Sequence, residues 1–182
     1  ASASKENRAA MVYYTYSSKS TTTNRSWFFY ANKVIDVAKS YLEMSRDEIL
    51  ATNPPIPLLD NAWCVDFVRL CCKIAGVYHK NENIKETSST GAMHDWFKNN
   101  FPSRFHEGTK GILKGDIVFI KKNGNLTHTC LAADTPKSDG SLLTINGNWL
   151  NTDIDNTRRV LYSTFPTNGQ YVDSYAHPNY YY

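Results

Sequence analysis

Apolar residues recur at helical spacing along the stretch 63–75, which Gly76 closes. Positions i, i+3, i+4, i+7, i+8 and i+11 are occupied by Cys64, Phe67, Val68, Cys71, Cys72 and Ala75. This spacing predicts an amphipathic helix with Cys64 in its first turn. Unpaired N–H groups and the positive end of the helix dipole stabilise a thiolate there. Cys64 is therefore a candidate nucleophile, although most cysteines on an apolar helix face are small core residues.

Three other segments before residue 100 have distinct patterns. An apolar stripe over 27–42 predicts a second core-packing helix. Residues 45–62 hold three prolines, which stop regular structure and predict an extended loop. Such a loop either lines a cleft or simply connects two helices. Residues 79–89 are polar and typical of a loop, whereas 90–99 predict a short helix.

Beyond Gly108 the pattern changes to that of β-strands. Strands are predicted at 116–120, 126–132, 142–145 and 159–162, with turn sequences between them. The tyrosine-rich end, 171–182, is expected to form a last strand or to pack on the sheet. Helices followed by a meandering antiparallel sheet indicate an α+β fold.

Length and composition bound the domain organisation and the partners. The 182 residues fit one domain, which we place at 26–182, preceded by a Ser-, Thr- and Lys-rich flexible arm or linker at 1–25. A net charge of +3 with scattered lysines gives no argument for nucleic acid but suits a polyanionic surface such as a bacterial wall. We find neither an apolar run of membrane-spanning length nor a signal-peptide pattern.

The four cysteines, at 64, 71, 72 and 130, predict neither a disulfide scaffold nor a metal site. Three of them share one helix, where no ladder of bridges can form among them. The sequence has no CxxC pair and its five histidines are dispersed, so we predict no metal and no cofactor. Cys71, Cys72 and Cys130 are assigned to packing, although Cys130 would also suit a pocket floor.

A cysteine nucleophile needs a base, and His128 is the preferred candidate. It lies in the predicted strand 126–132, where alternation places it on the same face as Cys130. A strand holds an imidazole rigidly, as a general base requires. The other histidines are expected in less suitable places: His79 and His106 in loops, His94 on the short helix and His177 near a disordered end.

The base also needs an orienting group, for which the sequence offers Asn146 and Asn148. Both follow His128 at a distance that suits the adjacent strand, and alternation places them on one face. Either amide oxygen could accept the imidazole N–H and fix the tautomer. Asn-Gly-Asn is also a standard turn sequence, and taken alone this fragment favours a turn.

Together these motifs resemble the CHAP family of cysteine, histidine-dependent amidohydrolases and peptidases, relatives of NlpC/P60 enzymes. The resemblance rests on Trp-Cys-Val-Asp-Phe-Val at 63–68, Lys-Gly-Asp-Ile-Val-Phe at 114–119, His128, and Ile-Asn-Gly-Asn at 145–148. It covers roughly residues 27–165. It implies a papain-like fold, secretion or delivery to the cell wall or periplasm, and hydrolysis of an amide or peptide bond in peptidoglycan.

The resemblance also implies roles for individual residues. The family nucleophile maps to Cys64, its base to His128, and its Glu-Gly-Asn to Asn146, Gly147 and Asn148. The usual glutamate is thus replaced by Asn146, which can hold the tautomer but supplies no charge to stabilise imidazolium. Asn61 is a candidate oxyanion helper, and Trp63 and Trp149 are candidate substrate contacts. The calcium-binding acidic loop of some members has no counterpart near Cys64.

Several alternatives stay open at the level of the sequence. The long segments 45–62 and 79–110 slightly favour an endopeptidase over an N-acetylmuramoyl-L-alanine amidase, because they would narrow the cleft around a peptide. A secreted cysteine peptidase acting on protein would share the same residues. An inactive wall-binding or interaction protein would keep them as a relic. An immunity or carrier protein is a further possible partner.

Overall fold

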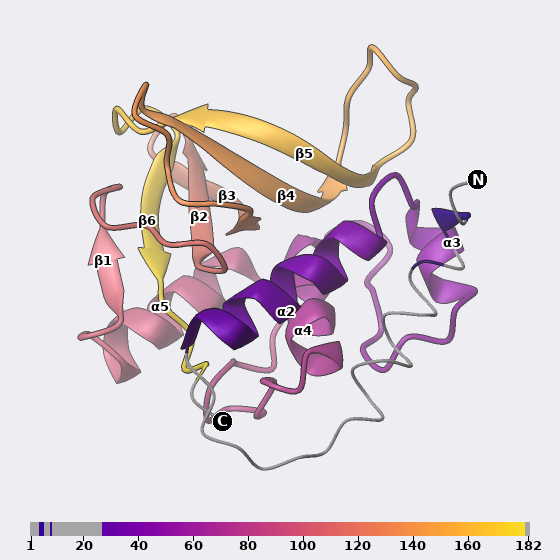
Figure 1. Cartoon of the computed structure of the whole chain (residues 1–182), viewed down its shortest axis with the longest axis horizontal. Helices are drawn as coiled ribbons and strands as arrows, with labels where there is room; N and C mark the ends of the chain where they lie inside the picture. Colours follow the sequence, from indigo (N-terminus) through magenta and orange to yellow (C-terminus); the bar gives the residue numbers. More distant parts are fainter. Residues whose placement is uncertain (1–3, 6–7, 9–26, 181–182) are drawn as a thin grey trace.

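The computed structural model describes residues 4, 5, 8 and 27–180 (Figure 1). Most of the predicted arm at 1–25 therefore lies outside the described residues. The helices are α2 (Trp27–Ser40), α3 (Arg46–Leu50), α4 (Cys64–Ile74) and α5 (Thr90–Asn100). The strands are β1 (Phe105–Glu107), β2 (Ile117–Lys122), β3 (Asn125–Ala132), β4 (Ser141–Trp149), β5 (Arg159–Pro166) and β6 (Val172–Ala176).

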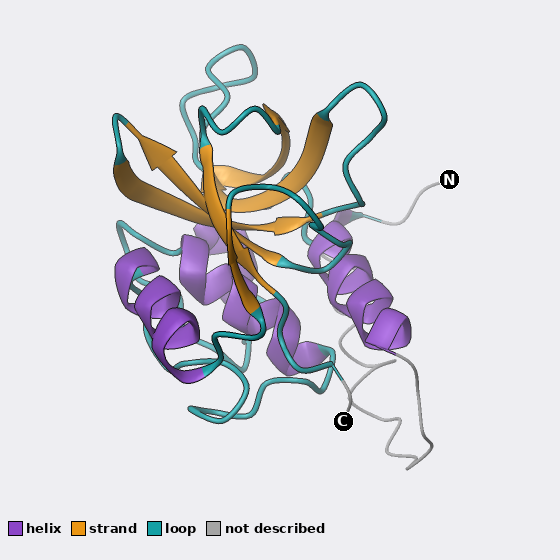
Figure 2. Cartoon of the chain, turned by 90° about the vertical axis from the view of Figure 1, so that its left-hand side faces the viewer, coloured by secondary structure: helices purple, strands orange, loops and turns teal. Residues whose placement is uncertain are grey.

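The strands form one six-stranded antiparallel sheet in the order β1-β6-β2-β3-β4-β5. Helices α2, α4 and α5 lie on one side of this sheet, as the side view in Figure 2 shows. Side chains along a strand point alternately to the two faces of the sheet, so they pack into two different hydrophobic clusters. Leu131 and Ile145 pack with the helices, whereas Cys130 and Leu142 pack in a second cluster on the other face. The α+β prediction is confirmed.

Helix α4 occupies the centre of the molecule, between α2 and strands β3 and β4. Every residue of α4 except Lys73 is buried, because the helix is covered on all sides. A helix that begins with a cysteine and packs against an antiparallel sheet is the papain-like arrangement that the sequence predicted.

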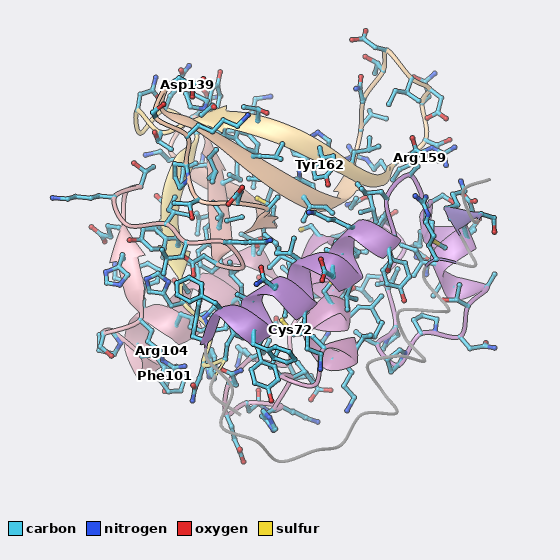
Figure 3. All side chains as sticks on the ribbon, viewed as in Figure 1. Cys72, Phe101, Arg104, Asp139, Arg159 and Tyr162 are labelled. Atoms are coloured by element: carbon cyan, nitrogen blue, oxygen red, sulfur yellow. The ribbon has the colours of Figure 1, made fainter. Side chains whose placement is uncertain are left out.

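The segment 45–62 was predicted to be an extended loop. This prediction is wrong for its first part, which forms helix α3. Ser45 caps this helix: its side chain accepts from Glu48 N, while the Glu48 carboxylate accepts from Ser45 N. This reciprocal capping box stabilises even a five-residue helix. Arg159 at the start of β5 fixes α3 to the sheet by donating to Glu48 at 3.1 Å and to the Glu43 carbonyl at 2.9 Å (Figure 3).

Two predictions for the C-terminal half were wrong. His106 lies in strand β1, not in a loop, because the C-terminal strand β6 inserts between β1 and β2 and pairs with both. His177 does not lie at a disordered end: its Nδ1 is 2.6 Å from the Asp116 carboxylate, which is fully buried. The prediction of a last strand within 171–182 is confirmed by β6.

Strand β4 extends four residues beyond its predicted end and contains the Asn-Gly-Asn sequence. The turn interpretation of this fragment is therefore wrong. The fragment is instead a bulge, because the pairing of β4 with β5 shifts register between Asn146 and Trp149. Asn148 adopts a φ of +57°, a left-handed conformation that asparagine tolerates better than most residues.

Candidate active site

Cys64 is the first residue of α4, as the sequence predicted. The preceding residue, Trp63, is the N-cap and makes no capping hydrogen bond through its side chain. The first N–H groups of any α-helix have no partner within the helix, so they are donors toward a group near Cys64. Cys64 is 7% exposed, whereas the other three cysteines are 0% exposed, so Cys64 is the most accessible of the four thiols.

The surroundings of Cys64 connect it to strand β3. The Thr90 hydroxyl lies 3.9 Å from Cys64 Sγ and 2.8 Å from the Thr129 hydroxyl, and Thr129 follows His128 in the chain. Burial raises the pKa of Cys130, and the nearby Cys64 makes a smaller electrostatic contribution in the same direction. Cys64 therefore lies near the part of β3 that carries His128 and Cys130.

A buried carboxylate holds the first turn of α4 in place. Asp66, 1% exposed, accepts from Leu59 N at 2.9 Å and from the Ser88 hydroxyl at 2.5 Å. It is also 3.3 Å from the Arg69 guanidinium. These contacts join α4 to the proline loop on one side and to the segment before α5 on the other. Asp66 thereby fixes the first turn of α4, which carries Cys64, to both segments, a role that the sequence did not predict.

His128 and Asn146 face each other where β3 and β4 separate. The ladder between these strands comprises the pairs Leu131 with Ile145 and Ala132 with Thr144, and it ends there. Beyond it, His128 Nε2 lies 2.9 Å from Asn146 Oδ1. Both residues are buried, His128 at 7% exposed and Asn146 at 0%.

The amide of Asn146 is fully engaged, which fixes its orientation. Its Nδ2 donates to the Thr144 hydroxyl at 3.1 Å and to the Leu161 carbonyl at 3.1 Å. Because both amide protons are used in this way, Oδ1 is the atom that faces His128, and it can only accept. His128 Nε2 must therefore carry the proton, and Nδ1 of the neutral ring is left as a proton acceptor.

The environment of His128 keeps the ring neutral. Its pKa is lowered from 6.5 to about 4, mainly by burial and to a smaller extent by the positive charge of Arg158, while the hydrogen bond to Asn146 acts in the opposite direction. At neutral pH the imidazole is therefore an uncharged base. A carboxylate in place of Asn146 would favour imidazolium, so the asparagine is consistent with a base that starts unprotonated.

The bulge in β4 changes which residues surround His128. With uninterrupted alternation, Trp149 would lie on the face opposite Asn146. The extra residue turns Trp149 to the same side, where its ring centroid is 4.8 Å from that of His128. Gly147 lies against α4, since a Cβ on it would be 2.4 Å from Cβ of Phe67. This close approach brings β4 directly onto the first turn of the Cys64 helix.

The two asparagines of the bulge have different partners, so the predicted shared face does not occur. The hydrogen bond of His128 is to Asn146 and not to Asn148. Its Nδ2 donates to the backbone carbonyl of Asn61 at 3.2 Å, and its own carbonyl accepts from Arg158 at 3.0 Å. Asn148 thus joins the bulge to the proline loop immediately before Trp63 and Cys64.

A cavity of about 360 Å³ opens beside this junction. Its walls come from the proline loop and from the β4–β5 connection: Ser45, Arg46, Asp47, Asp60, Asn61, Trp63, Asn148, Thr157 and Arg158. Asn61 is exposed, whereas Trp63 is 2% exposed and forms part of the wall without projecting from it. The interpretation of 45–62 as a cleft-lining segment is supported by this cavity.

The structure thus brings His128, Asn146 and Trp149 into contact, and places Asn61, Trp63 and Asn148 around one cavity. Thr90, Thr129 and Arg158 were missed in the sequence because isolated threonines and a surface arginine carry no motif. Among the described residues, no group of three or more His, Cys, Asp or Glu side chains could hold a metal ion. No helix in that part of the chain is long and apolar enough to cross a bilayer.

Comparisons with known proteins give one similarity. No protein-family model matches the chain, and no curated protein sequence matches it. Among solved structures, a crystal structure of a wild type endolysin, LysIME-EF1, is similar with a TM-score of 0.49 and 14% sequence identity. The similarity covers 81% of this chain and 63% of the endolysin chain. This chain thus spans less than two thirds of that protein.

Proposed function

We propose that this protein is a CHAP-like cell-wall hydrolase that cleaves an amide or peptide bond of peptidoglycan through a cysteine nucleophile. The main support is the 2.9 Å hydrogen bond between His128 Nε2 and Asn146 Oδ1, which leaves Nδ1 as the proton acceptor. The end of α4 that carries Cys64 packs near the same part of the sheet. A thiol at a helix start, an oriented neutral imidazole and an amide that fixes its tautomer are the parts that acyl transfer requires.

In the proposed first step, His128 Nδ1 takes the proton of the Cys64 thiol as the sulfur attacks the substrate carbonyl carbon. The carbonyl oxygen becomes negative and is held by N–H groups at the start of α4, with Asn61 as the candidate additional donor. The C–N bond then breaks, and His128 gives its proton to the leaving amine. The product of this step is a thioester on Cys64.

In the second step, a water molecule loses a proton to His128 Nδ1 and attacks the thioester carbon. The C–S bond breaks, the sulfur regains a proton from His128, and a carboxylic acid leaves. His128 must be neutral at the start of each step. Its lowered pKa secures this at neutral pH, so the reaction needs no resting thiolate–imidazolium pair.

The substrate class follows from the family resemblance together with the cavity. A cavity bounded by the proline loop and residues 157–158 suits a peptide more than a glycan strand, which favours cleavage within the stem peptide or its bridge. This activity would place the protein outside the cytoplasm, at the cell wall or in the periplasm. Peptidoglycan is the proposed partner, and an immunity or carrier protein stays a candidate further partner.

The alternative of an inactive wall-binding protein predicts no special reactivity at Cys64. Burial raises the pKa of Cys71, Cys72 and Cys130, and all three are 0% exposed, so these thiols should react slowly. We expect iodoacetamide to label Cys64 first and to abolish hydrolysis of purified peptidoglycan in parallel. Labelling of Cys64 no faster than of the other three, in a protein that releases no wall fragments, would favour the binding-protein alternative.

A further inference from the structure

Two arginines line the cavity beside the candidate active site, and they differ in how many of their N–H donors are engaged. Arg46 is fully occupied: its guanidinium donates to the carbonyls of Leu58 and Leu59 and pairs with Asp60 at 2.8 Å. It also lies 3.8 Å from Asp47. Arg46 therefore serves to hold the proline loop, and its charge is balanced by the two aspartates on the same wall.

Arg158, on the opposite wall, keeps most of its donors available. Its Nη1 donates to the Asn148 carbonyl at 3.0 Å, which holds the guanidinium at the cavity. No carboxylate among the described residues pairs with it. By contrast, its chain neighbour Arg159 is paired with both Glu48 and Asp155. A guanidinium has five N–H donors in a planar fork that matches a carboxylate, so Arg158 retains a complete carboxylate-binding edge.

The hydrogen bond from Arg158 to the Asn148 carbonyl also places Arg158 next to the proposed catalytic groups. Asn148, which accepts its hydrogen bond, is bonded in turn to the Asn61 backbone, three residues before Cys64. Thr157 lines the same cavity and adds a hydroxyl beside the guanidinium.

We propose that Arg158 and the cavity around it form a subsite for a free carboxylate of the substrate, next to the bond that is cut. The inference rests on the proposed function and specifies its substrate class: peptides with an acidic group near the scissile bond are preferred over the same peptides with that group amidated. Arg158 is thus a specificity-determining residue, with Asn148 as the group that positions it.

The charge relation between Arg158 and His128 supports this assignment. Burial is the main cause of the lowered pKa of His128, and the positive charge of Arg158 contributes in the same direction. A bound carboxylate would neutralise this charge and make the base stronger when the correct substrate is present. The Asn146 amide, which also affects the pKa of His128, is neutral and supplies no positive charge.

The test compares matched stem peptides from peptidoglycan in which one carboxylate at a time is free or converted to the carboxamide. Binding to the Cys64→Ala protein is measured by calorimetry, and kcat/KM is measured with the Cys64-containing protein. Each is repeated with Arg158→Gln, which removes the charge, and with Arg158→Lys, which keeps the charge without the fork. Lys137→Gln, in an exposed turn at 137–140, removes one positive charge away from the cavity as a matched control.

We expect one free-carboxylate peptide to bind about tenfold to hundredfold more tightly than its amide, the range of a charge-assisted hydrogen-bonded pair. Arg158→Gln should bring this ratio close to one, Arg158→Lys should leave an intermediate ratio, and Lys137→Gln should preserve it. The proposal is overturned if no peptide shows a preference, or if the preference survives in Arg158→Gln. Absence of cleavage in every peptide would contradict the proposed function instead, while the binding ratio would still decide on the subsite.

Discussion

Acidification should destabilise this protein through His128, by an amount that follows from its burial. The folded-state pKa is about 4, and a histidine in the unfolded chain has a pKa near 6.5. The unfolded state therefore binds the proton first, so the stabilisation is fully present above pH 6.5 and is lost as the pH falls toward 4. The gap between the two pKa values corresponds to about 3 kcal/mol at about 1.36 kcal/mol per pH unit.

Urea unfolding at several pH values between 7 and 4 measures this loss, with His128→Gln as the control. The variant retains every carboxylate and the four other histidines, so the difference between the two proteins isolates His128. The free energy of unfolding of the wild type should fall by about 3 kcal/mol more than that of the variant. Parallel curves for the two proteins would show that His128 titrates normally, and would refute the argument that burial keeps it neutral.

Three further predictions concern the bulge and the base. Asn146→Ala should lower kcat by about tenfold or more with little change in substrate binding, because the imidazole loses the group that orients it. A larger loss of kcat in Asn148→Ala would show that the orienting residue is misassigned. Gly147→Ala should destabilise the protein by about 1–3 kcal/mol in urea unfolding, because the new Cβ overlaps Phe67, and an unchanged midpoint would contradict that packing. The value of kcat/KM should fall on the acid side with a midpoint near pH 4, since protonated His128 cannot accept a proton. A midpoint above pH 6 would indicate that the pKa of His128 is not lowered.

Periodicity predicted the core elements because their burial pattern is regular. Helix α4 has apolar residues at helical spacing, and strands β2 and β3 carry the alternation or apolar runs that buried strands require. The order of helices before strands was enough to predict the α+β class. The contact between His128 and the strand that follows was also predictable, since β3 and β4 are neighbours in the sequence and in the sheet.

The features that the sequence could not reveal are those that break local regularity. Strand β6 pairs with β1 and β2, far away in the chain, so its position depends on tertiary contacts alone. The bulge at 146–149 separates Asn148 from Asn146 and turns Trp149 toward His128, whereas strict alternation predicts the reverse. The Ser45–Glu48 capping box is visible in the sequence, but the prolines that follow it masked the helix.

The central claim is that Cys64 cleaves peptidoglycan, and mass spectrometry of the digested wall tests it most directly. Purified peptidoglycan is incubated with the wild type and with Cys64→Ala, whose smaller side chain is tolerated at a helix start. The account predicts new peptide fragments, each with a free amine and a free carboxylic acid at the cut bond, from the wild type and none from the variant. Equal fragment yields from Cys64→Ala, with both proteins folded, would contradict it.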